Sequence, residues 1–409
     1  MSQRDLGILY DGPTHRRVVD LSGPLEVPPL TATEMRALGA YQRRVDLERS
    51  SIYRRLKPRI RQLTGALAYQ PAQDPPRVPD HPFVRVVSWN IERGTRLPGV
   101  TALFAEHPEA RDADIILLNE VDRGLARSGN RDVCLELARR LDMHMLFGNG
   151  YLALAPWPLP QGQTGETNQL GMHGNAILSR HPVLQAECFS VPVTSDRHDC
   201  PDRRLGHKKG LWARVRTPAG PLTVAAIHLD SNTSPERRGW QMRGVLLHLR
   251  RRGVTERILL GGDLNTSTFD FSSMAALVMD VAGKLLVGGP LGIMEECRHP
   301  ERRHERPLFD ALEQEGFTWR EQNPQAVETC RFEVEELEDA CAVMSFPPAP
   351  MIRAIAWYLR HLGGVAPFKL DWFASRGLRP VGQPAVIHRP TFNGHRVSDH
   401  DPVLVDVAW

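Results

Sequence analysis

The sequence Val397-Ser398-Asp399-His400-Asp401-Pro402-Val403-Leu404-Val405 places acidic residues and a histidine directly before a short apolar strand. Four other apolar segments lead straight into polar residues in a similar way. They are residues 84–89 before Asn90 and Glu92, 115–118 before Glu120, 222–227 before His228, and 258–262 before Asp263 and Asn265. Buried strands that end in Asn, Glu, His and Asp predict a polar site at one edge of a sheet.

The side chains at these strand ends are mostly oxygen donors, with a few imidazoles among them. The cysteines add no cluster of thiolates, because positions 134, 188, 200, 297, 330 and 341 contain no CxxC spacing. Such a donor set favours a hard cation, Mg2+ or Mn2+. The cysteine spacing supports neither a zinc site nor a disulfide framework, which is typical of a protein of the reducing cytoplasm.

Composition predicts a globular chain of one large domain with an appendage, or of two domains. The 409 residues are 41% hydrophobic and 24% charged, as is ordinary for globular proteins. The net charge of +3 argues neither for nor against a polyanionic partner. Arg4 and Asp5 follow the first residues with no apolar region behind them, and no uninterrupted apolar run approaches the length of a membrane span. We therefore expect a cytoplasmic protein without a signal peptide or a transmembrane segment.

Residues 1–80 are predicted to form an N-terminal extension. Residues 1–30 are polar, and residues 31–34 then read as a capping box at the start of a helix. An apolar stripe over residues 32–66 predicts one amphipathic helix that Pro58 kinks or splits. This helix carries nine Lys/Arg and three Asp/Glu, so it either packs its apolar face on the main domain or contacts nucleic acid or acidic lipid. Five prolines in residues 70–82 predict a linker.

Residues 82–409 alternate strands with short helices, such as those expected at residues 131–141 and 237–252, which predicts one α/β domain. A long insertion lies within residues 266–369. It contains a basic run at 298–306, an acidic run at 333–339 and an apolar, helix-like segment at 351–362. An insertion of this length is typical of a lid, a substrate platform or a substructure of its own.

Each candidate residue also has a simpler interpretation. A lone Glu120 could be a solvated carboxylate at a strand end, His228 a hydrogen-bonded core histidine, and His400 a surface residue. The spacing argues for a site, because Asn90 and Glu92 lie two residues apart and point the same way on an extended chain. Asp263 and Asn265 repeat this spacing after a glycine pair that allows close approach of a ligand.

Seven short motifs follow one another in an order that is similar to the endonuclease/exonuclease/phosphatase (deoxyribonuclease I-like) superfamily. They are SWNIE (88–92), LNEVD (118–122), GNAILSR (174–180), IHLD (227–230), GDLN (262–265), LDWF (370–373) and SDHDP (398–402). The resemblance implies a four-layer α/β sandwich of two mixed β-sheets flanked by helices, here with an N-terminal helical extension. It covers residues 84–405 and leaves the basic N-terminal helix and the insertion without a role.

The resemblance also implies roles for individual residues. Glu120 would be the principal metal ligand, assisted by Glu92 or Asn90 and by Asp399. Asp263 would orient or deprotonate the attacking water, and Asn265 and Asn90 would hold phosphate oxygens. His400 would contact the scissile phosphate with Asp371 hydrogen-bonded behind it, and His228 would be the second histidine at the phosphate. Glu92 departs from the Asp of AP endonucleases, and the sequence has no clear counterpart of their abasic-site loop, so abasic-site repair is not favoured.

The leading hypothesis is a Mg2+- or Mn2+-dependent nuclease-type phosphodiesterase with a nucleic acid as substrate. The basic pairs Arg203-Arg204, Lys208-Lys209 and Arg302-Arg303 favour it, since each pair could hold phosphates or could be a solvated surface. The first alternative is a phospholipid or inositol-phosphate phosphodiesterase or phosphatase, because the apolar segment 351–362 could lie on a membrane. The second alternative is a non-catalytic binding protein on the same fold.

Overall fold

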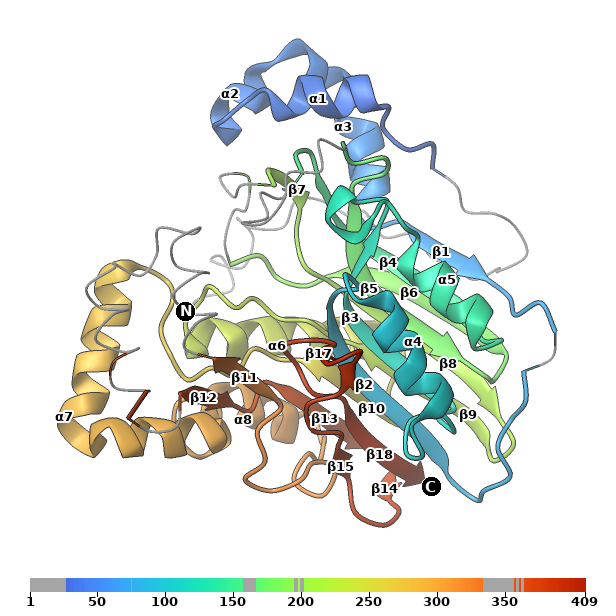
Figure 1. The fold of residues 1–409 in the computed structure, drawn as a ribbon, viewed down its shortest axis with the longest axis vertical. Coiled ribbons are helices and arrows are strands. Elements are labelled where there is room, and N and C mark those ends of the chain that lie inside the picture. Colours follow the sequence, from blue (N-terminus) through green and yellow to red (C-terminus); the bar gives the residue numbers. More distant parts are fainter. Residues whose placement is uncertain are drawn as a thin grey trace.

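The computed structural model describes residues 27–74, 76–156, 167–194, 198, 202–333, 357, 360–361 and 364–409 (Figure 1). Two sheets organise these residues. The larger sheet has nine strands in the order β1-β4-β5-β3-β2-β18-β14, with β7 beside β4 and β15 beside β18. Its strands are β1 (Leu67–Gln70), β2 (Val84–Arg93), β3 (Ile115–Arg123), β4 (His144–Ala153), β5 (Met172–Ser179), β7 (Arg204–Gly206), β14 (Arg379–Pro380), β15 (Ala385–Val386) and β18 (Val403–Ala408).

The smaller sheet has five strands in the order β13-β10-β9-β8-β6. They are β6 (Val183–Ser190), β8 (Lys209–Thr217), β9 (Gly220–Ala226), β10 (Ile258–Asp263) and β13 (Asp371–Arg376). Both sheets are mixed, because β2 runs parallel to β3 and β9 parallel to β10, whereas their other strand pairs are antiparallel. Two short hairpins stand apart: β11 (Cys330–Glu333) with β12 (Val365–Phe368), and β16 (Thr391–Phe392) with β17 (His395–Arg396).

The sheets pack face to face through one buried apolar layer. Val86, Leu117 and Ile177 of the larger sheet meet Leu211 and Val224 of the smaller sheet in this layer. The outer face of the larger sheet is covered by α4 (Leu97–Glu106) and α5 (Val133–Arg140), and that of the smaller sheet by α6 (Pro235–Arg251) and α8 (Arg306–Gln314) (Figure 1). The predicted four-layer α/β sandwich is therefore confirmed.

The N-terminal extension differs from the single kinked helix expected over residues 32–66. Three helices form instead: α1 (Ala32–Gly39), α2 (Arg44–Arg49) and α3 (Ser51–Leu63). The predicted capping box begins α1, since the Thr31 hydroxyl accepts from the Glu34 amide and the Glu34 carboxylate accepts from the Thr31 amide. The Ser50 hydroxyl caps α3 by accepting from the Tyr53 amide. Pro58 does not split the helix, as the sequence had suggested. It lies on an exposed turn within α3, where it costs the helix one hydrogen bond.

The extension is also tied to the main domain. β1 pairs antiparallel with β4 at the edge of the larger sheet. Leu38, Leu56 and Leu63 are buried in the same apolar cluster as the sheet and α4. The larger sheet and the apolar core therefore both include residues from each side of the predicted boundary near residue 80.

The long insertion contains α7 (Met274–Arg298), a 3-10 turn (Pro300–Arg302), α8 and the β11–β12 hairpin. Most of the expected apolar helix at 351–362 and of the acidic run at 333–339 lies outside the described residues. Within the described part of the chain, α7 alone has the length and apolar composition to cross a membrane. Its sequence is not an uninterrupted apolar run, because Asp280 and Lys284 lie within it. In the helix these two residues pair with each other at 2.5 Å.

Candidate functional site

The strand ends predicted to carry polar residues meet where the two sheets lie against each other. Asn90 at the end of β2 is in register with Asn119 of β3. Asp263 at the end of β10 is in register with Asp371 at the start of β13. Because these strands belong to facing sheets, residues from both layers of the sandwich surround one polar centre.

The backbone is irregular where the site side chains leave the strands. Glu92, Glu120 and Asn265 have φ angles of 46°, 53° and 52°, in the left-handed region that costs energy for residues other than glycine. The register of the larger sheet shifts between positions 90 and 93 and between 118 and 121. Such bulges redirect side chains out of the regular alternation. The sheet thus presents Glu92 and Glu120 at its edge.

His400 lies between two carboxylates. Its Nδ1–H donates to Oδ2 of Asp371 at 2.8 Å, and its Nε2 lies 3.8 Å from Oδ2 of Asp263. Burial alone would lower the pKa of His400, but nearby Cys330, Asp371, Asp263 and other acidic groups raise it well above its usual range. The ring is therefore an imidazolium at neutral pH, with Nε2–H directed into the site.

Thr329, which belongs to none of the seven motifs, holds Asp371 in place. Its hydroxyl donates to Oδ2 of Asp371 at 2.8 Å and accepts from the Leu370 and Asp371 amides. Oδ1 of Asp371 is buried and has no hydrogen-bond partner among the described residues. Thr329 precedes β11 and comes from the insertion, so the insertion contributes directly to the geometry of the Asp371–His400 pair.

Three asparagines, Asn90, Asn265 and Asn119, hydrogen-bond to the carboxylate or the backbone of Asp263. Asn90 donates through Nδ2 to Oδ2 of Asp263 at 3.1 Å, and the Asn265 amide donates to Oδ1 at 2.9 Å. The Asp263 amide in turn donates to Oδ1 of Asn119. Burial raises the pKa of Asp263 to about 6, against the opposing charge of His400. Asn119 is a second positioning residue, and it lies inside the LNEVD motif without a role implied by the resemblance.

His228 is neutral. Burial first, and then the charge of Lys208, hold its pKa well below the usual range. Nζ of Lys208 donates to Nε2 of His228 at 2.5 Å, and the same Nε2 lies 3.4 Å from Oδ2 of Asp263. Lys208 therefore places a positive charge beside His228 at the polar centre. The sequence indicated Lys208 only as one member of a basic pair.

Glu92, Glu120 and Asp399 supply a carboxylate group next to this centre. Burial, with repulsion from Asp399, raises the pKa of Glu92 to about 7. Burial would also raise the pKa of Glu120, but Arg93 and other nearby cations hold it well below its usual range. The charges of Asp399 and Glu120 both help to raise the pKa of Glu92, and a divalent cation would relieve this repulsion.

The donor set favours one of the two alternative metal ligands named from the sequence. Oδ1 of Asn90 already accepts from the Glu92 amide at 3.1 Å, and its Nδ2 is bonded to Asp263. Its oxygen is therefore engaged, whereas the Glu92 carboxylate has an ion pair with Arg96 at 3.3 Å that lies partly in solvent. Glu120, Glu92 and Asp399 fit Mg2+ or Mn2+ better than a set that includes Asn90.

A tighter acidic set also lies in the described part of the chain. Asp263, Asp371 and His400 have possible ligand atoms all within 4.8 Å of one another, whereas Glu92, Glu120 and Asp399 do not form such a set. Because the raised pKa of His400 keeps it protonated, an imidazolium already supplies the positive charge between the two aspartates. This set is thus arranged for proton handling, and the outer carboxylates are the oxygen ligands that could hold a metal ion.

A buried ion-pair network is centred on Asp122 of β3, the strand that also carries Glu120. Arg127 donates through Nε and Nη2 to both oxygens of Asp122, and its Nη1 lies 3.4 Å from Asp202. His173 donates to Asp122 at 2.6 Å. Burial would raise the pKa of Asp122, but Arg127 and His173 lower it to about 2. No pattern in the sequence indicated this network, because its members come from separate segments and strands.

Replacing Arg127 with alanine is expected to destabilise the fold by about 3–5 kcal/mol, because the change leaves the buried carboxylate of Asp122 without its cation. Urea unfolding of the two proteins measures the loss. Arg139→Ala on the exposed end of α5 is the matched control and should change stability by less than about 0.5 kcal/mol. Equal losses in the two variants would show that the network does not support the sheet.

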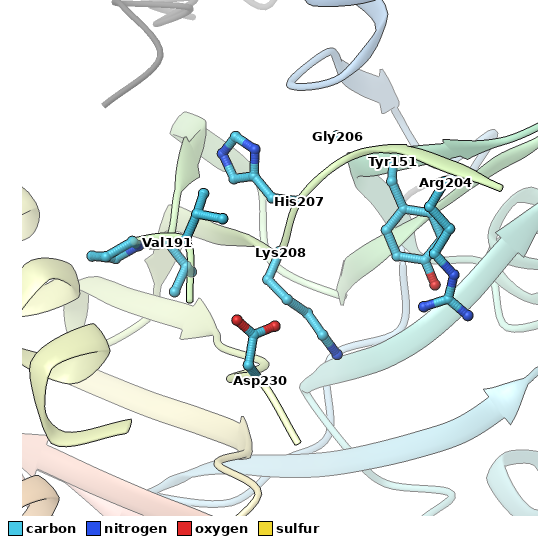
Figure 2. Close-up of a pocket in the computed structure, with 9 residues that line it drawn as sticks. Tyr151, Val191, Arg204, Gly206, His207, Lys208 and Asp230 are labelled. Carbon is cyan, nitrogen blue, oxygen red and sulfur yellow. The ribbon is translucent and has the colours of Figure 1, made fainter. Parts of the chain in front are cut away.

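A small hollow opens beside the site. Figure 2 shows Tyr151 and Arg204 against each other on one side, with Lys208 between that pair and Asp230. The guanidinium of Arg204 lies 4.5 Å from the centre of the Tyr151 ring and donates to Asp202. His207 forms part of the rim. The hollow is thus lined by Lys208, whose Nζ contacts His228.

Two of the basic pairs predicted to hold phosphates are engaged in internal contacts. Nζ of the buried Lys209 donates to the Ser190 hydroxyl at 2.8 Å. Arg302 and Arg303 lie 3.4 and 3.5 Å from Glu295 and Glu296. Lys209 therefore presents no charge to solvent, whereas Arg302 and Arg303 remain 63% and 64% exposed beside their acidic partners.

Comparisons with known proteins agree with this architecture. The model of the Endonuclease/Exonuclease/phosphatase family matches residues 87–400. A comparison with curated proteins gave no match.

Three solved structures are similar in fold. An endonuclease/exonuclease/phosphatase from Beutenbergia cavernae DSM 12333 is 19% identical, with coverage of 80% of this chain and 72% of that one and a TM-score of 0.47. D. rerio TDP2 complexed with a single-strand DNA product is 16% identical (80% and 100% covered, TM-score 0.44). The 3' phosphatase NExo from Neisseria, bound to a product DNA hairpin, is 18% identical (80% and 100% covered, TM-score 0.42).

Proposed function

The chain belongs to the endonuclease/exonuclease/phosphatase family, and from this we propose that it is a divalent-metal-dependent phosphodiesterase. Members of this family are typically hydrolases that act on phosphoesters. The observation that carries the proposal is the placement of His400 between Asp371 and Asp263, at distances of 2.8 and 3.8 Å. A protonated imidazole held in this way suits the stabilisation of charge on a phosphate.

Glu120, Glu92 and Asp399 would hold Mg2+ or Mn2+. A cation bound by these oxygens would neutralise charge on the phosphoryl and leaving oxygens of the substrate. The chain itself supplies proton handling. Asp263, with a pKa of about 6, can accept a proton from an attacking water near neutral pH. Asn90 and the Asn265 amide hold its carboxylate in one orientation while it does so.

His400 would stabilise the transition state. Nε2–H lies beyond hydrogen-bonding distance of Asp263, so it is available to a phosphate oxygen. Asp371 fixes the ring through Nδ1, and Thr329 fixes Asp371. His228 with Lys208, and Asn265 through its side chain, would bind the remaining phosphate oxygens.

A panel of substrates tests the activity. We expect hydrolysis of bis(p-nitrophenyl) phosphate that requires Mg2+ or Mn2+ and stops with EDTA. Single-stranded DNA, RNA, inositol phosphates and sphingomyelin, each with and without metal, then rank the substrate classes. An absence of hydrolysis across the panel with metal present would favour the non-catalytic alternative.

A nucleic acid is the first candidate substrate, and the basic N-terminal helices favour it. The segment between α1 and α2 contacts the main domain, since Nε2 of His198 lies 3.1 Å from the Tyr41 carbonyl. Burial, followed by the charges of Lys209 and Arg44, lowers the pKa of His207 to about 3, and His207 lies on the rim of the hollow. Arg54, Arg55 and other cations of α3 are exposed and add positive charge to the N-terminal helices.

Replacing three exposed α3 cations by serine (Arg54→Ser, Arg55→Ser, Arg61→Ser) is expected to weaken oligonucleotide binding. The log–log salt slope should become shallower by roughly one unit for each phosphate that the variant no longer binds. Fluorescence anisotropy of a labelled oligonucleotide across a salt series, with Ca2+ in place of Mg2+, measures both effects. Substitution is preferable to truncation, because β1 belongs to the sheet.

The matched control replaces three exposed cations elsewhere, Arg139→Ser, Arg140→Ser and Arg214→Ser. This control removes the same charge from other surfaces. If both triple variants lose affinity and slope equally, α3 has no specific role in binding. If neither changes, the helices only pack on the sheet.

A phospholipid phosphodiester is the second candidate, and one specific observation favours it. α7 presents large apolar side chains to solvent over much of its length. Surfaces of this kind mark contacts with proteins or membranes. The predicted cytoplasmic location is compatible with either substrate class.

A further inference from the structure

α7 is the most apolar exposed surface in the described part of the chain. Leu286 is 89% exposed, Val287 74%, Met279 70% and Leu291 68%. Figure 1 shows the helix as two arms that meet at a bend on the outer edge of the molecule, away from both sheets. The bend lies at Gly289, which has a φ of 60° and a ψ of −172° and is followed by Pro290.

The two arms are anchored at their far ends and carry little charge between them. Leu277 and Cys297 are buried. From 281 to 294 the charged residue is Lys284, and its buried Nζ bonds to Asp280 and to the Thr268 carbonyl. The exposed surface of residues 285–291 therefore carries no formal charge.

Two ordinary explanations of an apolar helix do not fit. A core helix of a soluble protein is mostly buried, but only Leu277, Lys284 and Cys297 of α7 are buried. A signal sequence lies near the N-terminus, whereas α7 lies in the second half of the chain. A straight membrane span is also unsuitable, because Gly289 and Pro290 break the helix into arms of roughly 15 and 9 residues, shorter than the ~20 that a span requires.

We propose that residues 285–291 of α7 insert into the interfacial region of a phospholipid bilayer. The apolar side chains on this bend, which carries no formal charge, match the uncharged hydrocarbon just below the headgroups. Residues 266–333 contain twelve Asp/Glu and seven Lys/Arg, so attraction to anionic lipid is not the basis of the contact. Zwitterionic phosphatidylcholine is therefore sufficient.

The anchors of α7 lie next to catalytic segments. Lys284 bonds the carbonyl of Thr268, three residues after Asn265. The Cys297 carbonyl accepts from the amide of Lys369, two residues before Asp371. Both arms of α7 are therefore bonded to segments that carry site residues. That the docked protein cleaves a lipid phosphodiester there rests on the proposed function.

Co-sedimentation of the full chain with phosphatidylcholine vesicles tests the docking. We compare the wild type with Leu286→Glu/Val287→Glu, at low and high salt. The matched control is Val45→Glu/Val78→Glu, which places the same charges at two exposed valines (50% and 40%) outside α7. Circular dichroism and hydrolysis of bis(p-nitrophenyl) phosphate verify that both variants fold.

We expect the wild type and the control to bind vesicles at both salt concentrations, and Leu286→Glu/Val287→Glu to lose at least ~10-fold in partition coefficient, since a charge on the apolar face opposes insertion. No binding by the wild type, or equal binding by the two variants, would overturn the assignment. So would sedimentation velocity showing a wild-type dimer that Leu286→Glu/Val287→Glu dissociates, since a second copy would then cover α7. Vesicle binding without any phosphodiester hydrolysis would overturn the proposed function alone.

Discussion

Replacing Glu120 with alanine should lower metal-dependent hydrolysis at least ~1000-fold, because removal of the proposed principal metal ligand would forfeit several kcal/mol of charge stabilisation in the transition state. Glu120 lies at a bulge of β3, with its pKa held low by Arg93 and other cations. The carboxylate is therefore ionised at neutral pH, which is the form that a divalent cation binds. Initial rates with bis(p-nitrophenyl) phosphate at saturating Mg2+ or Mn2+ measure the loss.

The fold should survive this change. Glu120 is partly exposed, its ion pair with Arg93 is long at 3.8 Å, and its removal relieves repulsion with Glu92. Melting without metal should therefore shift little, whereas stabilisation by added Mg2+ or Mn2+ should shrink, since ligand-linked stability follows affinity. Glu136→Ala on α5 is the control and should keep full activity and metal response. Wild-type turnover in Glu120→Ala would refute the metal assignment.

Replacing His400 with alanine should cost at least ~100-fold in turnover, the usual scale for a positioned charge-stabilising group. Asp371→Asn should act through His400, because Oδ2 of Asp371 accepts from Nδ1 of that ring. The double variant should therefore lose little more than His400→Ala alone. A kinetic cycle of the four proteins measures the interaction, and strict additivity would contradict the pairing.

The pH profile of Asp371→Asn separates this role from a merely structural one. In the wild type Asp371 helps to raise the pKa of His400. Without that carboxylate the imidazolium should lose its proton at lower pH, so the alkaline limb of turnover should move to lower pH. Asp310→Asn on α8 should leave the profile unchanged. An unshifted limb in Asp371→Asn would mean that the pair does not set the protonation of His400.

The sequence was sufficient for the fold, and it named residues that the fold brings together, although their roles stay predictions. Apolar strands that end in Asn, Glu, His or Asp predicted a polar edge, because strand formation depends on local alternation and burial. The order of seven short motifs predicted the four-layer sandwich. Asp371, His400 and Asp263 do meet, with a hydrogen bond at 2.8 Å.

The partners of these residues could not be foreseen from sequence. Thr329 reaches Asp371 from 42 positions away, and Arg127 joins segments around positions 122 and 202. Such pairs depend on which segments the fold brings together. The same holds for the basic pairs, since Arg302, Arg303 and Lys209 carry charge in the sequence but have internal partners in the fold.

By itself, the sequence determined the strands, the family and the chemical types at the site, since these depend on residue identity and local order. Tertiary structure alone decided whether an apolar segment is core or surface. Asp280 and Lys284 interrupt the apolar sequence of α7, but in the helix they lie one turn apart and form an ion pair. Residues 285–291 at the bend contain no charged side chain. Exposure is a property of what packs against a helix, and for α7 little of the described chain does so.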